Sequence, residues 1–438
     1  MSTKVSYQNF QGVNLVSLTG GSKYEQGVAY GEVLAPTLQG ARNHLVKIFA
    51  EKYNITYSKL VRSSELFYER YPDEFKPYLV GMADGSGLEL EGINILNGMT
   101  TFIPLIENGD LEGNIVHCTY LYIPNDKGKD NHSLMGRNYD FYSEIYGPLA
   151  SNLTITIFND EGKVPTATIA MPGEGYCPSC VNANGLFMEL NAGSPSGGNY
   201  LVQNRQTMLA TKLQVMQNSS DFNSMHNQMI AKESDYSLII NTADDNSVFS
   251  YEYSSNSSLG MKPFVPQQND IFVSTNFYQN SSWGDDIPVP TDATTWMGIT
   301  RKNNAQNLAS KYQVLDVIDM KEIMSVDLQK GGFLWSPTIY QMIFQPDKLL
   351  LSVRTNPTMN KNWVDIDLHD WFFSSISQEK YEAEDKTLKC SDSNDLVFGG
   401  LFLVGGALAI TIAGVVAQRL GCCNPMINGD LLYVDLLE

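Results

Sequence analysis

Apolar positions in the first quarter of the chain recur every three and four residues. In residues 24–53 this spacing places them along one side of a helix, and residues 68–98 predict two short helices around turns rich in glycine and aspartate. We therefore expect residues 24–105 to be mainly helical.

From about residue 114 the spacing changes to the short apolar and β-branched runs that are typical of strands. The predicted strands are residues 115–124, 133–141, 152–160, 166–173, 185–193, 236–242, 247–254 and 270–278. The predicted helices between and after them are residues 200–217, 221–231 and 299–312. Groups of strands with helices between them predict an α+β domain, with sheets covered by helices, that ends near residue 374.

A second kind of segment follows this domain. Residues 376–395 are polar and charged and predict a linker, whereas residues 396–417 carry no charge and would form a helix of about 33 Å, which is long enough to cross a bilayer. We expect one transmembrane helix and a short tail, residues 418–438. Small residues recur every four positions in this run, which would allow two helices to pair and so form a homodimer. They are Gly405, Ala409, Ala413 and Ala417.

Charge and sequons bear on partners and location. The net charge of −19 and the pI of about 4.6 disfavour nucleic acid as a partner. Six Asn-x-Ser/Thr sequons precede the apolar run and favour a glycosylated domain in an endolysosomal lumen or outside the cell, although no signal peptide is visible. The tail residues Tyr433–Leu436 resemble a tyrosine-based endocytic signal. The sequon asparagines are Asn54, Asn131, Asn152, Asn218, Asn256 and Asn280.

The six cysteines are too few for a disulfide scaffold. Cys177 and Cys180 form a CPSC sequence that favours a local structural role such as a disulfide, with redox chemistry or a metal site as the alternatives. Cys422 and Cys423 follow the apolar run, where S-palmitoylation occurs on a cytosolic face; the alternative is two unmodified thiols.

The residues that could carry chemistry lie in a predicted hairpin. The sequence contains no Gly-rich phosphate loop, HExxH, EF-hand loop or GxSxG elbow, and no histidine is marked as the partner of a cysteine. Pairing residues 115–124 with 133–141 about a turn near Lys127 and Gly128 places Cys118 opposite Arg137. An adjacent guanidinium would stabilise a thiolate.

Five blocks in order resemble the choloylglycine hydrolase, penicillin acyltransferase and acid amidase group of N-terminal-nucleophile hydrolases. HCTYLYIP and MGRNYDF resemble the start of the catalytic chain, and the helical segments before them resemble the pro-segment of the acyltransferase branch. VNANGLFMELNAG, FVSTNFY and ITRKNNAQ resemble later blocks. The resemblance covers residues 15–374 and implies a four-layer αββα sandwich with an inactive precursor.

The resemblance also implies roles for individual residues. Cleavage between His117 and Cys118 would leave Cys118 as nucleophile and N-terminus, with its own α-amino group as the base. Arg137 would hold the thiolate, and Asp140 would bind the amino group. In an ideal strand Arg137 and Asp140 face opposite sides, so we expect a bend there. The oxyanion donors would be Asn191 and Asn276, with Arg301 steadying the network.

The predicted organisation is a pro-segment at residues 1–117 that stays associated as the small chain, and a catalytic domain at residues 118–375. The predicted reaction is hydrolysis of a linear amide without a cofactor, on an N-acyl lipid such as an N-acylethanolamine or a ceramide-like amide. The alternatives are acyl transfer to an amine, and an inert membrane-anchored glycoprotein that keeps the fold.

Overall fold

A computed structural model describes residues 2–98, 118–198, 202, 204–256, 259–267, 269–291, 297–359 and 362–373. The chain divides into two units, residues 1–379 and 380–438, and the described residues all belong to the first. Among them, no helix is both long and apolar enough to cross a membrane. The predicted transmembrane helix, its linker, its tail and His117 lie outside the described residues.

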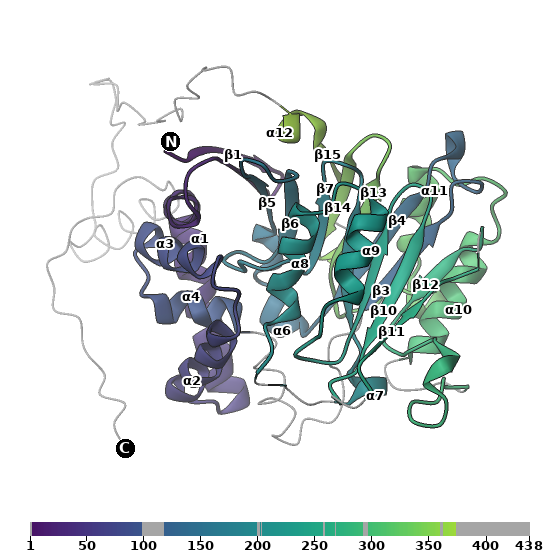
Figure 1. Cartoon of the computed structure of the whole chain (residues 1–438), viewed down its shortest axis with the longest axis horizontal. Helices are drawn as coiled ribbons and strands as arrows, with labels where there is room; N and C mark the ends of the chain where they lie inside the picture. Colours follow the sequence, from purple (N-terminus) through teal and green to yellow (C-terminus); the bar gives the residue numbers. More distant parts are fainter. Residues whose placement is uncertain are drawn as a thin grey trace, which may run out of the picture. The chain divides into compact units, whose positions relative to one another are not determined.

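Residues 2–98 form two strands and four helices (Figure 1). The four helices, α1 (Lys23–Tyr53), α2 (Tyr57–Glu69), α3 (Lys76–Ser86) and α4 (Leu90–Asn97), confirm the predicted helical region as far as residue 98. Glycines allow α1 and α3 to cross at close range, because a Cβ on Gly27 would lie 2.1 Å from the carbonyl oxygen of Tyr78.

Two sheets form the centre of this unit. The first has nine strands, in the order β1 (Lys4–Phe10), β2 (Val13–Thr19), β5 (Thr154–Asn159), β6 (Thr166–Ala170), β7 (Ser179–Asn182), β8 (Phe187–Ala192), β9 (Leu238–Ala243), β10 (Val248–Tyr253) and β11 (Met261–Phe264). The second has six, in the order β12 (Phe272–Ser274), β3 (Cys118–Ile123), β4 (Leu134–Asp140), β13 (Thr338–Gln345), β14 (Leu350–Thr355) and β15 (Val364–Asp367). Neighbouring strands are antiparallel except β2 and β5, which are parallel.

The remaining described elements are short. The helices are α6 (Ser143–Tyr146), α7 (Ser194–Gly197), α8 (Met208–Gln217), α9 (Phe222–Ile230), α10 (Gly298–Ala309), α11 (Val317–Met324) and α12 (His369–Phe373). The 3₁₀ turns are Lys129–Asn131, Ala150–Asn152, Ser281–Trp283, Leu328–Lys330 and Pro357–Met359.

The sheets pack face to face and helices cover their outer faces. Between the sheets, Tyr120 of β3 stacks on Phe187 of β8 with ring centroids 5.5 Å apart. α8 lies on β6 and β7, whereas α10 and α11 lie on β3, β4, β12 and β13. The layers are therefore helix, sheet, sheet and helix, which confirms the predicted α+β class.

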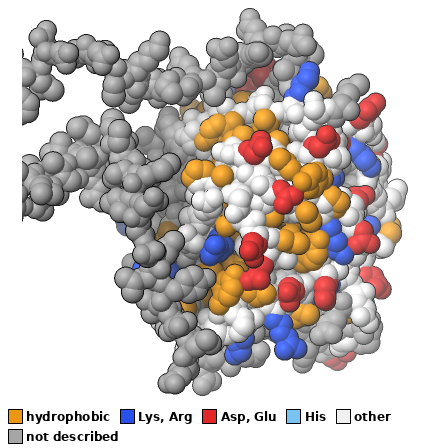
Figure 2. Space-filling view, turned by 90° about the vertical axis from the view of Figure 1, so that its left-hand side faces the viewer, with side chains coloured by type: hydrophobic (Ala, Val, Ile, Leu, Met, Phe, Trp, Pro, Cys, Tyr) orange, Lys and Arg blue, Asp and Glu red, His pale blue; other side chains and the backbone are white. Residues whose placement is uncertain are grey.

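The side of the molecule that carries α1–α4 has a mixed surface. Figure 2 shows acidic, basic and hydrophobic side chains interspersed over its described residues, without a continuous basic surface in this view. Four of the six sequon asparagines are exposed, and Asn152 and Asn280 are half-buried.

Candidate active site

Cys118 is the first residue of β3 and the one free cysteine among the described residues, and its side chain is fully buried. The predicted hairpin of β3 and β4 is confirmed, but its predicted register is wrong. Cys118 lies opposite Tyr139, and Arg137 lies opposite Tyr120.

The connection between the strands explains the difference. It contains a 3₁₀ turn at Lys129–Asn131, in which Asp130 and Asn131 adopt positive φ angles of 60° and 62°. This turn moves the centre of the hairpin one residue along the chain, so the register changes by two residues. A change of two leaves each side chain on its face, and Arg137 still lies diagonally beside Cys118.

Arg137 occupies the inner face of the six-stranded sheet and is fully buried. Its Nη2 donates to Sγ of Cys118 at 3.5 Å and to the carbonyl oxygen of Leu190 at 2.6 Å. Its Nη1 donates to the carbonyl oxygen of Pro178 and to Oγ of Ser179. The guanidinium is therefore held by the opposite sheet while it contacts the thiol.

Glu189 supplies the charge that balances Arg137. The Oε2 of this fully buried β8 residue lies 3.2 Å from Nε of Arg137, and Asn241 donates to the other carboxylate oxygen. Burial is the largest single influence and acts to lower the pKa of Arg137, but Glu189, Tyr340 and Cys118 together outweigh it and the pKa is raised. Arg137 therefore remains a cation beside the thiol.

Arg301 contacts the other side of Cys118. It lies on α10, and its Nη1 donates to the carbonyl oxygen of Cys118 at 2.7 Å and to Oγ1 of Thr119 at 2.6 Å. The same nitrogen lies 3.7 Å from Oδ2 of Asp140, which also accepts from Nε1 of Trp335 at 2.8 Å. These contacts hold the main chain of Cys118, whereas Arg137 contacts the sulfur.

Asp140 lies on the outer face, as strand alternation requires. The predicted bend in β4 is therefore not needed, because Arg301 reaches Asp140 from the helix layer outside the sheet. β4 pairs with β13, and the irregularity in their pairing lies in β13, between Thr338 and Tyr340.

The two asparagines approach from the nine-stranded sheet and from the loop after β12. In this uncut chain the backbone N–H of Cys118 donates to Oδ1 of Asn276 at 3.0 Å, and Nη2 of Arg301 donates to the same oxygen at 2.8 Å. Nδ2 of Asn276 donates to the carbonyl oxygen of Ala192 at 3.0 Å. Asn191, on β8, donates to the carbonyl oxygen and hydroxyl of Ser274 at 3.3 Å.

The site shifts the ionisation of its groups. Burial raises the pKa of the Cys118 thiol, although the charge of Arg137 acts in the opposite direction. Burial also raises the pKa of Asp140 to about 6, against the charge of Arg301, and lowers the pKa of Arg301. The Cys118 thiol is therefore held mainly in its neutral form.

Six of the seven predicted site residues lie in the described part of the chain, and the seventh, His117, lies outside it. Arg137, Asn276 and Arg301 contact Cys118 directly. Asp140 lies beside Arg301, whereas Asn191 contacts Ser274 and not Cys118. Glu189 was missed, although a signal existed. It lies two positions before Asn191 in the same predicted strand, and therefore on the same face, and a charge in such an apolar run is rarely left without a partner.

A cavity of about 190 Å³ reaches Asn276. Its lining is mixed: Phe277, Ile287 and three prolines contribute apolar side chains, and Ser196, Asn276 and Asp286 contribute polar ones. Among the residues that the structure describes, no group of three or more His, Cys, Asp or Glu side chains is placed to hold a metal ion.

Solved structures similar to this chain come from the group that the sequence blocks resemble. A mutant of the conjugated bile acid hydrolase of Clostridium perfringens aligns over 58% of this chain and 93% of its own, with 14% identity and a TM-score of 0.42. The predicted resemblance is confirmed. A Caenorhabditis elegans ortholog of N-acylethanolamine-hydrolyzing acid amidase aligns over 52% and 93%, with 15% identity and a TM-score of 0.39.

Penicillin V acylase from Agrobacterium tumefaciens aligns over 57% of this chain and 86% of its own, with 11% identity and a TM-score of 0.39. No family model and no curated protein matches the sequence. At such low identities and TM-scores, function has to be argued from the residues of this chain.

Proposed function

We propose that this protein is a self-processing cysteine amidase that hydrolyses linear carbon–nitrogen amide bonds. The observation that carries the proposal is the position of Cys118 between two fully buried arginines. Arg137 donates to its sulfur, and Arg301 donates to its carbonyl oxygen. Burying two guanidinium groups carries a large desolvation cost, so their convergence on one cysteine favours a chemical role.

Maturation would begin at the peptide bond before Cys118. The sulfur attacks the carbonyl carbon of His117, the bond from that carbon to the Cys118 nitrogen breaks, and the nitrogen takes up a proton and leaves as an amine. Water then hydrolyses the thioester and restores the thiol. The contacts of Asn276 and Arg301 with the backbone of Cys118 would keep this peptide unit in position.

The matured enzyme would use the new amino group as its base. Its reference pKa of about 7.7–8.0 allows it to accept the thiol proton near neutral pH, so no histidine is required. The sulfur attacks the substrate carbonyl, the amine leaves with a proton, and water releases the acid from the acyl-enzyme. Asp140 would hold the amino group, and the amides of Asn191 and Asn276 would reorient toward the oxyanion.

An N-acyl substrate with an apolar chain is the substrate class that we propose. The cavity at Asn276 supports this choice because it offers an apolar wall, which includes Phe277 and Ile287, beside polar groups that could bind the amide. The predicted membrane anchor and lumenal glycosylation remain proposals and would place the enzyme beside lipid amides. Transfer of the same acyl group to an amine in place of water is the alternative outcome at the acyl-enzyme.

The small chain would stay bound after cleavage. Its strand β2 pairs with β5 from Asn14 opposite Thr154 to Thr19 opposite Asn159, so it is an internal strand of the nine-stranded sheet. Nζ of Lys23 also lies 2.6 Å from Oδ2 of Asp160. We expect the two chains to elute together in native size-exclusion chromatography.

A denaturing gel with N-terminal sequencing tests the proposal. Wild-type protein should give two chains, with about one quarter and three quarters of the 48.7-kDa mass, and the large chain should begin at Cys118. Cys118→Ala should remain one chain. Tyr122→Phe, a buried change four residues along the same strand, should be cut normally. A different N-terminus, or cleavage in Cys118→Ala, would contradict self-processing at this site.

A further inference from the structure

The Cys177–Cys180 disulfide encloses the two residues that hold Arg137. The structure joins these cysteines, which settles the open reading of the CPSC sequence in favour of a disulfide. Pro178 and Ser179 lie between them and are the acceptors of Arg137 Nη1, through the carbonyl oxygen and the hydroxyl. We call residues 177–180 the disulfide turn.

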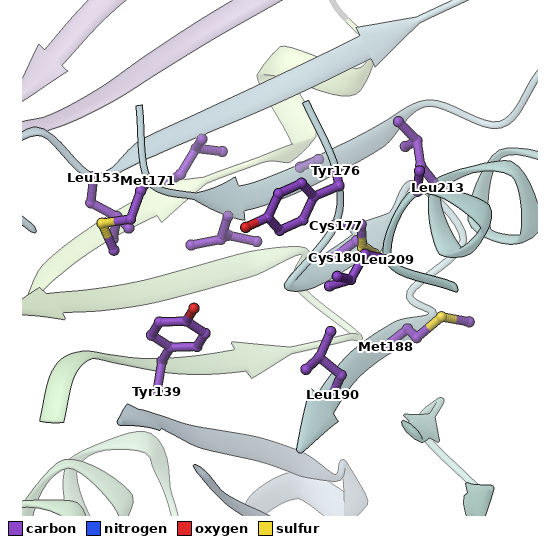
Figure 3. Packing of buried hydrophobic residues seen from close by; sticks show 14 of the residues in the cluster. Tyr139, Leu153, Met171, Tyr176, Cys177, Cys180, Met188, Leu190, Leu209 and Leu213 are labelled. Atoms are coloured by element: carbon purple, nitrogen blue, oxygen red, sulfur yellow. A yellow bond between two sulfur atoms is a disulfide. The ribbon is translucent and has the colours of Figure 1, made fainter. Parts of the chain in front are cut away.

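The disulfide turn is held from several directions. The backbone N–H of Cys177 donates to the carbonyl oxygen of Leu209 on α8 at 3.2 Å, and Ser179 pairs with Glu189 across β7 and β8. Figure 3 shows the disulfide between the core of the sheet and Leu209 and Leu213 of α8. Ser179 Oγ and the Tyr340 hydroxyl, 3.0 Å apart, link the turn to the opposite sheet.

A second buried cation shares the turn with Arg137. Nζ of Lys212, which is fully buried on α8, donates to the Pro178 carbonyl oxygen at 3.1 Å, so one carbonyl accepts from both Lys212 and Arg137. Burial lowers the pKa of Lys212 well below its usual range. The charge of Arg137 adds to this lowering, so the two groups repel each other whenever Lys212 is protonated, and a flexible turn would let them separate.

A purely stabilising role explains this disulfide poorly. It closes a loop with a sequence separation of only three, and short loops remove little entropy from the unfolded chain. Its position matters more, because a small rotation of the turn would move the acceptors of Arg137. Such a rotation would act on the 3.5 Å contact between Arg137 Nη2 and Cys118 Sγ.

We infer that the Cys177–Cys180 disulfide and Lys212 are positioning groups that hold the disulfide turn, and through it keep the Arg137 guanidinium against the Cys118 thiol. This inference rests on the proposed function of Cys118. Neither group touches the reacting atoms. The charged or titratable groups around the thiol are Arg137, Glu189, Asp140, Arg301, Lys212, Tyr139 and Tyr340.

The test compares Cys177→Ala/Cys180→Ala and Lys212→Met with wild type in matured protein. The thiol pKa is read from the pH dependence of Cys118 alkylation by iodoacetamide, followed by mass spectrometry. We expect the thiol pKa to rise by about one unit, and kcat to fall about 10-fold or more while KM changes little, because the cation that favours the thiolate is displaced. A change confined to the melting temperature would overturn the inference.

Leu315→Ala is the matched control, because it opens a cavity among the residues that α10 and α11 bury and lies outside the disulfide turn. It should lower the melting temperature and leave both the thiol pKa and kcat per folded molecule unchanged. If the double cysteine variant does not fold, Lys212→Met decides by the same two readouts. Alkylation needs no substrate, so a shifted thiol pKa in an enzyme that cleaves no amide would refute the amidase function and leave the positioning role standing.

Discussion

The two faces of the six-stranded sheet hold Cys118 in different ways. On the inner face, Arg137 donates to the sulfur and forms a 3.2 Å ion pair with Glu189. On the outer face, Arg301 donates to the main chain of Cys118 and lies 3.7 Å from Asp140. One arginine therefore acts on the nucleophile and the other on the peptide unit that carries it.

The ionisation of the two pairs follows this geometry. Glu189, Tyr340 and Cys118 together raise the pKa of Arg137 above its ordinary value against the effect of burial. Burial lowers the pKa of Arg301 and raises that of Asp140 to about 6. Burial raises the pKa of Glu189 as well, against the charge of Arg137, so the two pairs differ mainly in their arginines, of which only Arg301 has a lowered pKa. The comparison teaches that the two faces have different tasks. The inner face sets the ionisation of the Cys118 thiol, and the outer face positions the main chain of Cys118.

The largest effect is expected at the inner face. Arg137→Met should lower amidase turnover by about 100- to 1000-fold in protein supplied already cut, since a positioned charge beside the reacting atom is removed. Kinetics on an N-acyl amide and the alkylation pKa of Cys118 measure this change. Arg354→Met removes another buried arginine of the same sheet, one that donates to Gln341, and should keep turnover. Equal losses of turnover in Arg137→Met and Arg354→Met would contradict a specific role for the arginine beside the sulfur.

Glu189→Gln should come next, with a loss of about 3 kcal/mol in the free energy of unfolding at pH 7, because Arg137 becomes a buried charge without its counterion. Urea unfolding measures the loss. Glu252→Gln is the control, since this buried carboxylate accepts from neutral donors such as the Trp283 indole and should lose less. A larger loss of unfolding free energy in Glu252→Gln would show that the ion pair of Arg137 and Glu189 stabilises the fold less than the hydrogen bonds of Glu252 do.

Asp140→Asn tests the outer pair through pH. The pKa of Asp140 is about 6 in the folded protein, above its ordinary value of 3.8. Between these two pH values the folded state therefore keeps a proton that the unfolded state has released. Wild type should therefore lose stability relative to Asp140→Asn as the pH rises from about 4 to 6, by up to about 3 kcal/mol, and the gap should then level off.

Urea unfolding of both proteins at several pH values measures this gap. Asp365→Asn is the control and should show the opposite pH dependence. The Lys321 ion pair lowers the pKa of Asp365, so wild type should lose stability relative to Asp365→Asn as the pH falls. A gap between wild type and Asp140→Asn that does not change from pH 4 to 7 would exclude a raised pKa.

The smallest effect is expected from Arg301→Met. Loss of its bond to the Cys118 carbonyl should slow self-cleavage by about 10-fold, a cost near that of one charged hydrogen bond, and leave the thiol pKa unchanged. A time course of cleavage on a gel measures the rate. Lys302→Met, at the next residue of α10, is the control. A shift of the thiol pKa in Arg301→Met would show that the outer face also tunes the sulfur.

Local periodicity was sufficient for much of this structure. It predicted the helices before residue 98, the hairpin of β3 and β4, and the strand that carries Asn191, because these depend on neighbouring residues. Seven strands were missed: β1, β2, β7, β11, β13, β14 and β15. Two of them pair with partners far along the chain, and β2 joins β5 across more than a hundred residues. Such pairing leaves little mark in a local window.

The sequence by itself determined which side chains share a face, since the period of two survived the error in register. It thereby placed Arg137 beside Cys118 and Asp140 on the other side of β4. Only the tertiary structure decided what each face meets: Glu189 and the disulfide turn on the inner side, and Arg301 on the outer side. The reason is that alternation is a property of one strand, whereas the charge that balances a buried arginine comes from another layer of the fold.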